Sequence, residues 1–217
     1  GAIIDAETAY LELEKFPGLQ VLSILWSNWL ILLGTVHGQY LNHAETKTML
    51  VHENSLYFAK AWSSLVSDTN FSWFNAKNLP VFSKGFAEGI LVLTAPIPLK
   101  EVNYWLEQFP GIKLLSLDRK LVKTLRSTFN WLTPKKIPAN IFQYQNKPLQ
   151  SVVWHPVFVV RKDFPISKAT KLLQLLYAQR NSLIPHPLFK NLRLADNLPY
   201  QKIYSFHPAT KSMFKLK

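Results

Sequence analysis

Short apolar runs alternate with amphipathic helical stretches along most of this chain. The runs at 20–26, 90–93 and 112–117 have the length of buried strands, and they are bounded by polar or proline-containing segments. In the stretch 56–66, apolar residues recur at helical spacing. Strands that alternate with helices are typical of a sheet with parallel strands and helical crossovers. The pattern therefore predicts an α/β fold with a largely parallel sheet.

The predicted elements follow the chain in order. We expect strands at 2–4, 20–26, 29–35, 49–51, 71–74, 90–93, 112–117 and 151–160. We expect helices at 7–15, 56–66, 81–87, 98–109, 118–129 and 166–180. Asp118 is expected to cap one of these helices, and the proline-containing segment 133–148 is expected to be a loop.

The length favours two lobes. A chain of 217 residues accommodates two lobes of about 100 residues each, and 48% hydrophobic residues are enough for a substantial core. We expect a discontinuous first lobe from residues 1–35 and 151–217, and a second lobe from residues 36–150. No apolar run is long enough to cross a bilayer.

The charge is unevenly distributed. Residues 1–112 carry 6 Lys and Arg against 10 Asp and Glu, whereas residues 113–217 carry 19 against 3. One helix face concentrates Arg119, Lys120, Lys123 and Arg126, and no aromatic residue alternates with these charges. Binders of single strands need such stacking platforms beside the charge. We therefore expect a solvated basic surface and no specific binding of nucleic acid.

The usual signatures of enzymes are absent from the sequence. It contains no glycine-rich phosphate loop, no nucleophile elbow and no zinc-protease motif, and it has no cysteine. The six histidines do not pair at helical spacing, and His155, His186 and His207 each precede a proline, which indicates turns or strand breaks. We expect neither an enzyme nor a bound metal or cofactor.

One local pattern suits an anion. The apolar run 49–51 is followed by His52, Glu53, Asn54 and Ser55, and then by a predicted helix. A strand that leads into a helix presents free backbone N–H groups and a favourable dipole to a negative charge. A helix cap without any ligand explains the same residues, and both interpretations stay open here.

Several stretches, in order along the chain, resemble the TAXI family of solute receptors, which serve tripartite ATP-independent periplasmic (TRAP) transporters. The resemblance rests on the strand-to-turn segment 3–10, the strands within 19–33, the turn 94–98, the strand 111–118 and VFVVRKDFP at 157–165. It covers nearly the whole chain, although no single motif is diagnostic. Glu53 and Asn54 depart from the family, which has glycine or serine there.

The resemblance implies a two-lobed type II periplasmic-binding-protein fold, with a hinge and a ligand in the cleft, and here with an incomplete first lobe. It implies a periplasmic receptor that captures a small carboxylate and hands it to membrane transporter subunits. The candidate ligand-binding residues, each at a strand end or in a loop, are Asp5, Trp26, Asn54, Ser55, Pro96 and Tyr144. Trp26 and Tyr144 would wall the site, and Asn54 and Ser55 would donate hydrogen bonds.

A second function of a different class fits the same sequence. From the resemblance, we expect this sequence to lack the first glycine-rich ligand loop of the family, and Glu53 would repel an anionic solute. With 7 tryptophans, the fold could have been retained as a protein-protein interaction module whose aromatic residues form the interface. A filled cleft beside an apolar surface patch would favour this alternative.

Overall fold

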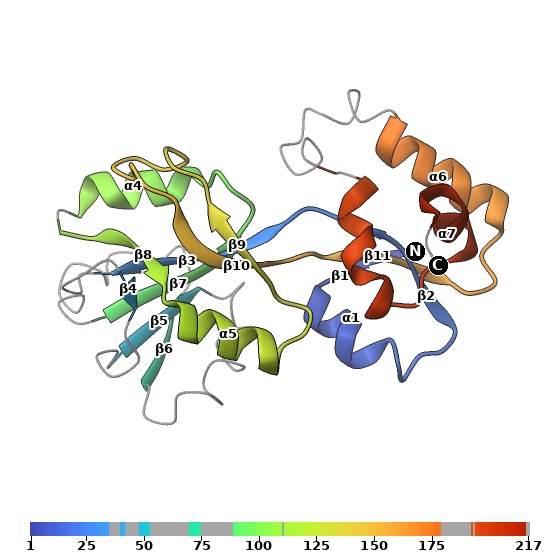
Figure 1. Cartoon of the computed structure of the whole chain (residues 1–217), viewed down its shortest axis with the longest axis horizontal. Helices are drawn as coiled ribbons and strands as arrows, with labels where there is room; N and C mark the ends of the chain where they lie inside the picture. The colour runs from blue at the N-terminus through green and yellow to red at the C-terminus, as the bar shows by residue number, and fades with distance from the viewer. Residues whose placement is uncertain are drawn as a thin grey trace. The chain divides into compact units, whose positions relative to one another are not determined.

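The computed structural model of the chain (Figure 1) describes residues 1–34, 40–41, 48–52, 70–74, 89–109, 111–178, 192 and 194–215. The chain forms two compact units. Unit 1 contains Gly1–Ser27 and Trp154–Lys217, and unit 2 contains Asn28–Val153. Both units combine helices and strands, which confirms the predicted α/β class.

Unit 2 is built on a mixed sheet. Six strands form its path in the order β4-β8-β3-β7-β5-β6. Their bounds are β3 Asn28–Gly34, β4 Tyr40–Leu41, β5 Thr48–His52, β6 Asn70–Phe74, β7 Gly89–Ala95 and β8 Lys113–Leu117. Strand β5 pairs in parallel with both β6 and β7, whereas β3 is antiparallel to both β7 and β8. On this path, one reversed strand, β3, therefore lies between the parallel strands β7 and β8.

The strand order of unit 2 reverses direction at β5. The chain passes from β5 to β6 on one side and then returns to β7 on the other side. An open sheet whose strand order reverses in this way is called doubly wound. The gap between the two strands at which the order reverses is its topological switch point. In unit 2 the switch point lies between the carboxyl ends of β5 and β7.

Helix α4 (Lys100–Gln108) covers one face of this sheet through Val102, Trp105 and Leu106. These side chains share a buried cluster with alternate residues of β3 and β7, as the pleat of a strand requires. The strand members are Trp29, Ile31, Leu33, Leu91 and Leu93. Helix α5 (Arg119–Thr128) lies on the other side of the sheet in Figure 1, and it buries Leu121, Val122 and Leu125. Its predicted cap is confirmed, because Asp118 Oδ1 accepts a hydrogen bond from Leu121 N at 2.7 Å.

The segment predicted as a loop contains a strand instead. Strand β9 (Thr133–Ile137) pairs antiparallel with β10 (Leu149–Trp154). Pro134, Lys135 and Lys136 gave the segment a polar, proline-containing pattern. Proline is tolerated in a strand at a sheet edge, where its missing N–H is not needed. The pairing that makes β9 a strand is therefore tertiary, and local composition did not predict it.

The long strand predicted at 151–160 is interrupted. Strand β10 ends at Trp154, and β11 (Val157–Arg161) begins after His155 and Pro156. The carbonyl of Pro156 accepts a hydrogen bond from Leu25 N at 2.9 Å, and His155 Nδ1 lies 3.2 Å from the carbonyl oxygen of Leu25. Proline cannot donate to a sheet ladder, and this explains why the strand breaks there.

Unit 1 contains a three-stranded sheet in the order β1-β11-β2, with β1 at Ala2–Ile4 and β2 at Leu19–Ile24. Both β1 and β2 are antiparallel to β11. One face packs against α1 (Ala6–Glu12) and the 3₁₀ segment η5 (Leu194–Lys202), and the other packs against α6 (Ile166–Ala178) and α7 (Pro208–Phe214). Neighbouring residues Val21 and Leu22 belong to these two different clusters, as strand alternation requires.

The two units differ from the predicted lobes at both crossings. The prediction assigned residues 28–35 to the first lobe, but β3 pairs with β7 and β8 and therefore belongs to unit 2. It also assigned residues 151–153 to the first lobe, but β10 pairs there with β9 of unit 2. The chain passes between the units at 27–28 and 153–154.

A buried polar network joins η5 to the sheet of unit 1. Asn197 is fully buried, and its Oδ1 accepts a hydrogen bond from Ile24 N at 2.8 Å. Its Nδ2 donates to the Tyr177 hydroxyl at 3.0 Å, and that hydroxyl is also hydrogen-bonded to the Ser23 hydroxyl. A buried amide N–H without a partner is costly, so Asn197 stabilises the end of β2.

Replacing Asn197 with alanine should lower the free energy of unfolding by about 1–3 kcal/mol, because the buried N–H of Ile24 loses its acceptor. Urea unfolding of Asn197→Ala against the wild type measures this difference. The matched control is Gln201→Ala, an exposed amide on the same segment, which should change stability by less than about 0.5 kcal/mol. Equal effects of the two substitutions would contradict the assigned role.

Candidate functional site

The carboxyl edge of the unit 2 sheet gathers the ends of its parallel strands. Strand β5 ends at His52, β7 ends at Ala95 and β8 ends at Leu117. The reversed strand β3 begins at this edge, because Trp29 pairs with Ala95. In open α/β sheets, ligands bind outside the carboxyl ends of the strands at the switch point. This edge is therefore the candidate functional site.

The turn after β7 forms one wall of the edge. Pro96 and Ile97 are half-buried, and Ile97 packs against the cluster beneath α4. The turn leads to Leu99, the N-cap residue of α4, which offers no side-chain hydrogen bond to the helix. The structure thus places the predicted contact Pro96 at the carboxyl edge, beside the start of a helix that lacks a side-chain cap.

A lysine and a tryptophan meet at the same edge. The side chain of Trp29 is 7% exposed, and Lys135 Nζ lies 5.4 Å from the centroid of its ring. Lys135 is exposed, and its neighbour Ser151 on β10 donates a hydrogen bond to the carbonyl of Leu30 at 2.6 Å. This bond holds β9 and β10 beside the start of β3. A cation over the face of an indole ring is attracted to it, so the positive charge is held in place at the edge.

The sequence did not single out Trp29 or Lys135. Trp29 is the first residue of the strand predicted at 29–35, and Lys135 stands in the segment predicted as a loop. The two residues are far apart in sequence. Strand β10 lies between β3, which carries Trp29, and β9, which carries Lys135, and it brings the two residues together. The one local signal was an aromatic residue at the start of a strand.

Asp5 and Trp26 lie at a corresponding edge of unit 1. Strands β1 and β2 flank the same residue of β11, because Ile4 and Ile24 both pair with Val157. Asp5 follows directly after β1, and Trp26 comes two residues after β2. Strand register thus brings these two predicted contacts to one edge, although they are distant in sequence.

The carboxylate of Asp5 is engaged in local structure. Asp5 is the N-cap of α1, and its Oδ1 accepts a hydrogen bond from Ala6 N at 2.9 Å. Burial raises the pKa of the Asp5 carboxyl above its usual range, and hydrogen bonds from the Ala6 backbone and the Trp154 side chain partly offset this effect. Desolvation disfavours the charged form, so burial is the dominant cause.

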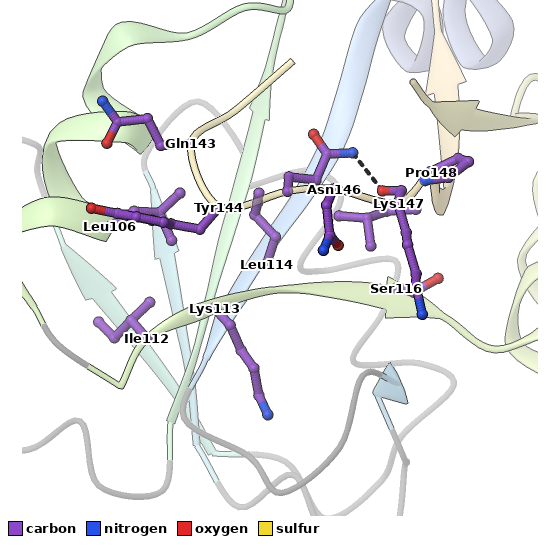
Figure 2. Close-up of a pocket in the computed structure, with 12 residues that line it drawn as sticks. Leu106, Ile112, Lys113, Leu114, Ser116, Gln143, Tyr144, Asn146, Lys147 and Pro148 are labelled. Carbon is purple, nitrogen blue, oxygen red and sulfur yellow. Dashed lines mark hydrogen bonds between the residues drawn. The ribbon is translucent and has the colours of Figure 1, made fainter. Parts of the chain in front are cut away.

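Tyr144 lies beside a pocket of unit 2 (Figure 2), and the lining of this pocket does not include Trp29, Pro96 or Lys135 of the carboxyl edge. Tyr144 lines this pocket with Leu106 near the end of α4 and Ile112 near the start of β8. Its side chain is 82% exposed. The structure therefore separates Tyr144 from Pro96, although both belong to unit 2, and it gives the tyrosine a pocket of its own. The predicted contacts Asn54 and Ser55 lie outside the described residues.

The part of the chain that the structure describes lacks two kinds of feature. No group of three or more His, Cys, Asp or Glu side chains in it could hold a metal ion. No helix within these same residues is long and apolar enough to cross a membrane.

Comparisons with known proteins gave partial structural likenesses. No family model and no curated protein sequence matches the chain. The GluR0 ligand-binding core in complex with L-glutamate is 12% identical, with a TM-score of 0.42 over 82% of this chain and 64% of that chain. The reduced OxyR regulatory domain from Pseudomonas aeruginosa is 11% identical, with a TM-score of 0.36 over 78% and 76%. The substrate-binding protein of an amino acid ABC transporter is 9% identical, with a TM-score of 0.30 over 70% and 63%. The chain thus spans less than two thirds of the first and third of these proteins.

The raised pKa of Asp5 gives a stability difference that depends on pH. A carboxyl whose pKa is higher in the folded state favours folding at low pH and opposes it as the pH rises through that pKa. Asn at position 5 remains a good helix cap and carries no charge. We expect Asp5→Asn to be more stable than the wild type at pH 7, with the gap narrowing as the pH falls toward 4.

Urea unfolding of both proteins at several pH values tests this expectation. Glu12→Gln is the control, because Glu12 lies on the same helix and forms an exposed ion pair with Lys15. Loss of stability in Asp5→Asn at pH 7 would show that the charged carboxylate stabilises the fold, which contradicts the dominance of burial.

Proposed function

We propose that this chain is a periplasmic solute receptor that captures a small carboxylate and delivers it to a TRAP-type membrane transporter. The observation that carries the proposal is the strand order of unit 2, with its switch point between β5 and β7. Ligands of doubly wound sheets bind outside the carboxyl ends at such a point. The resemblance to TAXI receptors adds the transporter, the periplasm and the carboxylate class.

The chemistry of the carboxyl edge fits a small carboxylate. Lys135 supplies an exposed positive charge held over Trp29, and a charged hydrogen bond to a carboxylate is stronger than a neutral one. Pro96, which is half-buried in the turn after β7, offers apolar surface to the rest of the solute. Asn54 and Ser55 follow β5 in sequence and remain predicted donors at the same edge.

We propose that the chain captures the solute without a chemical reaction. The described groups at this edge include a lysine, an indole ring and a proline turn, which suit binding and orientation. Asp118, the nearest acid in sequence after β8, already accepts the hydrogen bond that caps α5. General acid–base work needs a titratable group that is free to exchange a proton with the substrate.

One observation that favoured the alternative function, an interaction module, is not supported by the described residues. The alternative relied on tryptophans as an exposed interface, but Trp29, Trp105, Trp131 and Trp154 are all buried. These four side chains stabilise the interior of the chain. We therefore keep solute capture as the function that the described residues favour.

Lys135→Gln should weaken binding of the captured carboxylate about tenfold, the cost of one charge-assisted hydrogen bond. The control is Lys136→Gln, which removes the same charge from the next residue of β9. Successive residues of a strand point to opposite faces, so the control leaves the Trp29 side unchanged. Thermal-shift screening of amino acids, dicarboxylates and keto acids identifies the ligand, and calorimetry then measures Kd.

Two results would count against the receptor. The first is a folded protein whose midpoint of thermal unfolding no member of the panel raises at millimolar concentration. The second is a carboxylate that binds with the same Kd to the wild type, Lys135→Gln and Lys136→Gln, because the solute would then bind elsewhere.

A further inference from the structure

A buried glutamine, Gln145, holds the loop that carries Tyr144 through several hydrogen bonds. Gln145 is 6% exposed, and its Nε2 donates to the carbonyls of Pro138 and Lys147 at 2.8 and 3.0 Å. Its Oε1 accepts a hydrogen bond from Phe142 N at 3.2 Å, and its backbone carbonyl accepts one from Asn140 N at 2.8 Å. The side-chain amide is thus fully used within the loop. This bonding fixes the loop conformation before any partner arrives.

The fixed loop forces Tyr144 into an unfavourable backbone conformation. Its φ angle is 60°, in the left-handed region that bulky side chains rarely adopt. Tyr144 is nevertheless 82% exposed, so no burial of its ring compensates for the strain. Such strain persists only where the surroundings enforce it, and it gathers at functional sites. Here the strain presents an aromatic ring beside a pocket.

The pocket has an apolar end and a polar end. Its volume is about 250 Å³, enough for a monocyclic molecule. In Figure 2 the Tyr144 ring lies at one end with Leu106 and Ile112, and Lys147 lies at the other end with Ser116. The Asn146 amide lies between the ends, close to Leu114 in the view. An occupant that matches both ends has a flat apolar part and a polar group.

The polar end favours a negative charge. Among the residues that the structure describes, the two charged side chains that line the pocket are both lysines, Lys113 and Lys147, and none of these lining residues is an acid. Both lysines line the cavity, and Figure 2 shows Lys147 at the polar end, on the side of Ser116. The amide of Asn146 adds N–H donors beside it.

We propose that this pocket is a second binding site, specific for a small aromatic carboxylate. The ring stacks on Tyr144 over Leu106 and Leu114, and the carboxylate pairs with Lys147 and accepts from the Asn146 amide. The pocket runs along β8 and the loop 143–148, and none of its lining residues is Trp29, Pro96 or Lys135 of the carboxyl edge. Binding here is therefore independent of the solute proposed above.

Benzoate is the probe, and benzamide is its uncharged counterpart of the same shape. We expect benzoate to shift the amide signals of Tyr144, Asn146 and Lys147 in NMR spectra of the labelled full chain. Tyr144→Ala and Lys147→Gln should each weaken this binding about fivefold or more. Tyr104→Ala and Lys123→Gln are the controls, since both residues are exposed and outside the pocket, and Lys135→Gln should also leave benzoate binding unchanged.

The variant Tyr144→Gly distinguishes a loss of benzoate binding from a loss of folding. Glycine adopts the left-handed region without strain, so Tyr144→Gly should be at least as resistant to heat as the wild type while losing benzoate affinity. Three results would overturn the proposal: no shifts at the loop with millimolar benzoate, equal binding of benzamide, or unchanged affinity in Tyr144→Gly and Lys147→Gln. Loss of benzoate binding in Lys135→Gln would instead assign the ligand to the carboxyl edge.

Discussion

The reversed strand β3 is the feature on which the organisation of unit 2 depends. It pairs with β7 from Trp29 to Gly34 and with β8 at its end, and so joins two parallel strands that do not contact each other directly. Its side chains Ile31 and Leu33 fill the core on the α4 side. Because β3 runs against its neighbours, its first residues lie at the carboxyl edge of the sheet. The strand that completes the core therefore also delivers Trp29 to the candidate site.

The strands on either side of β3 follow from the sequence, but the groups around its first residues do not. Apolar runs predicted β3, β7 and β8 within a few residues, because buried parallel strands are nearly continuous in hydrophobicity. Strand β9 escaped prediction because its pattern is polar and contains proline, and it is a strand only through pairing with β10. Lys135 was missed for the same reason, since its position depends on that pairing.

The predicted ligand-binding residues are of two kinds. The positions of some follow from the ends of strands, and the position of Tyr144 depends on a loop. Asp5, Trp26 and Pro96 follow strands, and the structure places each of them at a carboxyl edge. Tyr144 belongs to a loop whose shape is determined by the hydrogen bonds of Gln145. No spacing rule predicts where such a loop directs its side chains. This explains why a tyrosine expected at the solute site lines a different pocket.

A crystal structure of the full chain with the tightest ligand of the panel would show whether a small carboxylate binds at the carboxyl edge of unit 2. We expect the ligand carboxylate within hydrogen-bonding distance of Lys135 Nζ, with the rest of the ligand against Pro96. Ligand density elsewhere, with this edge empty, would contradict binding at the carboxyl edge.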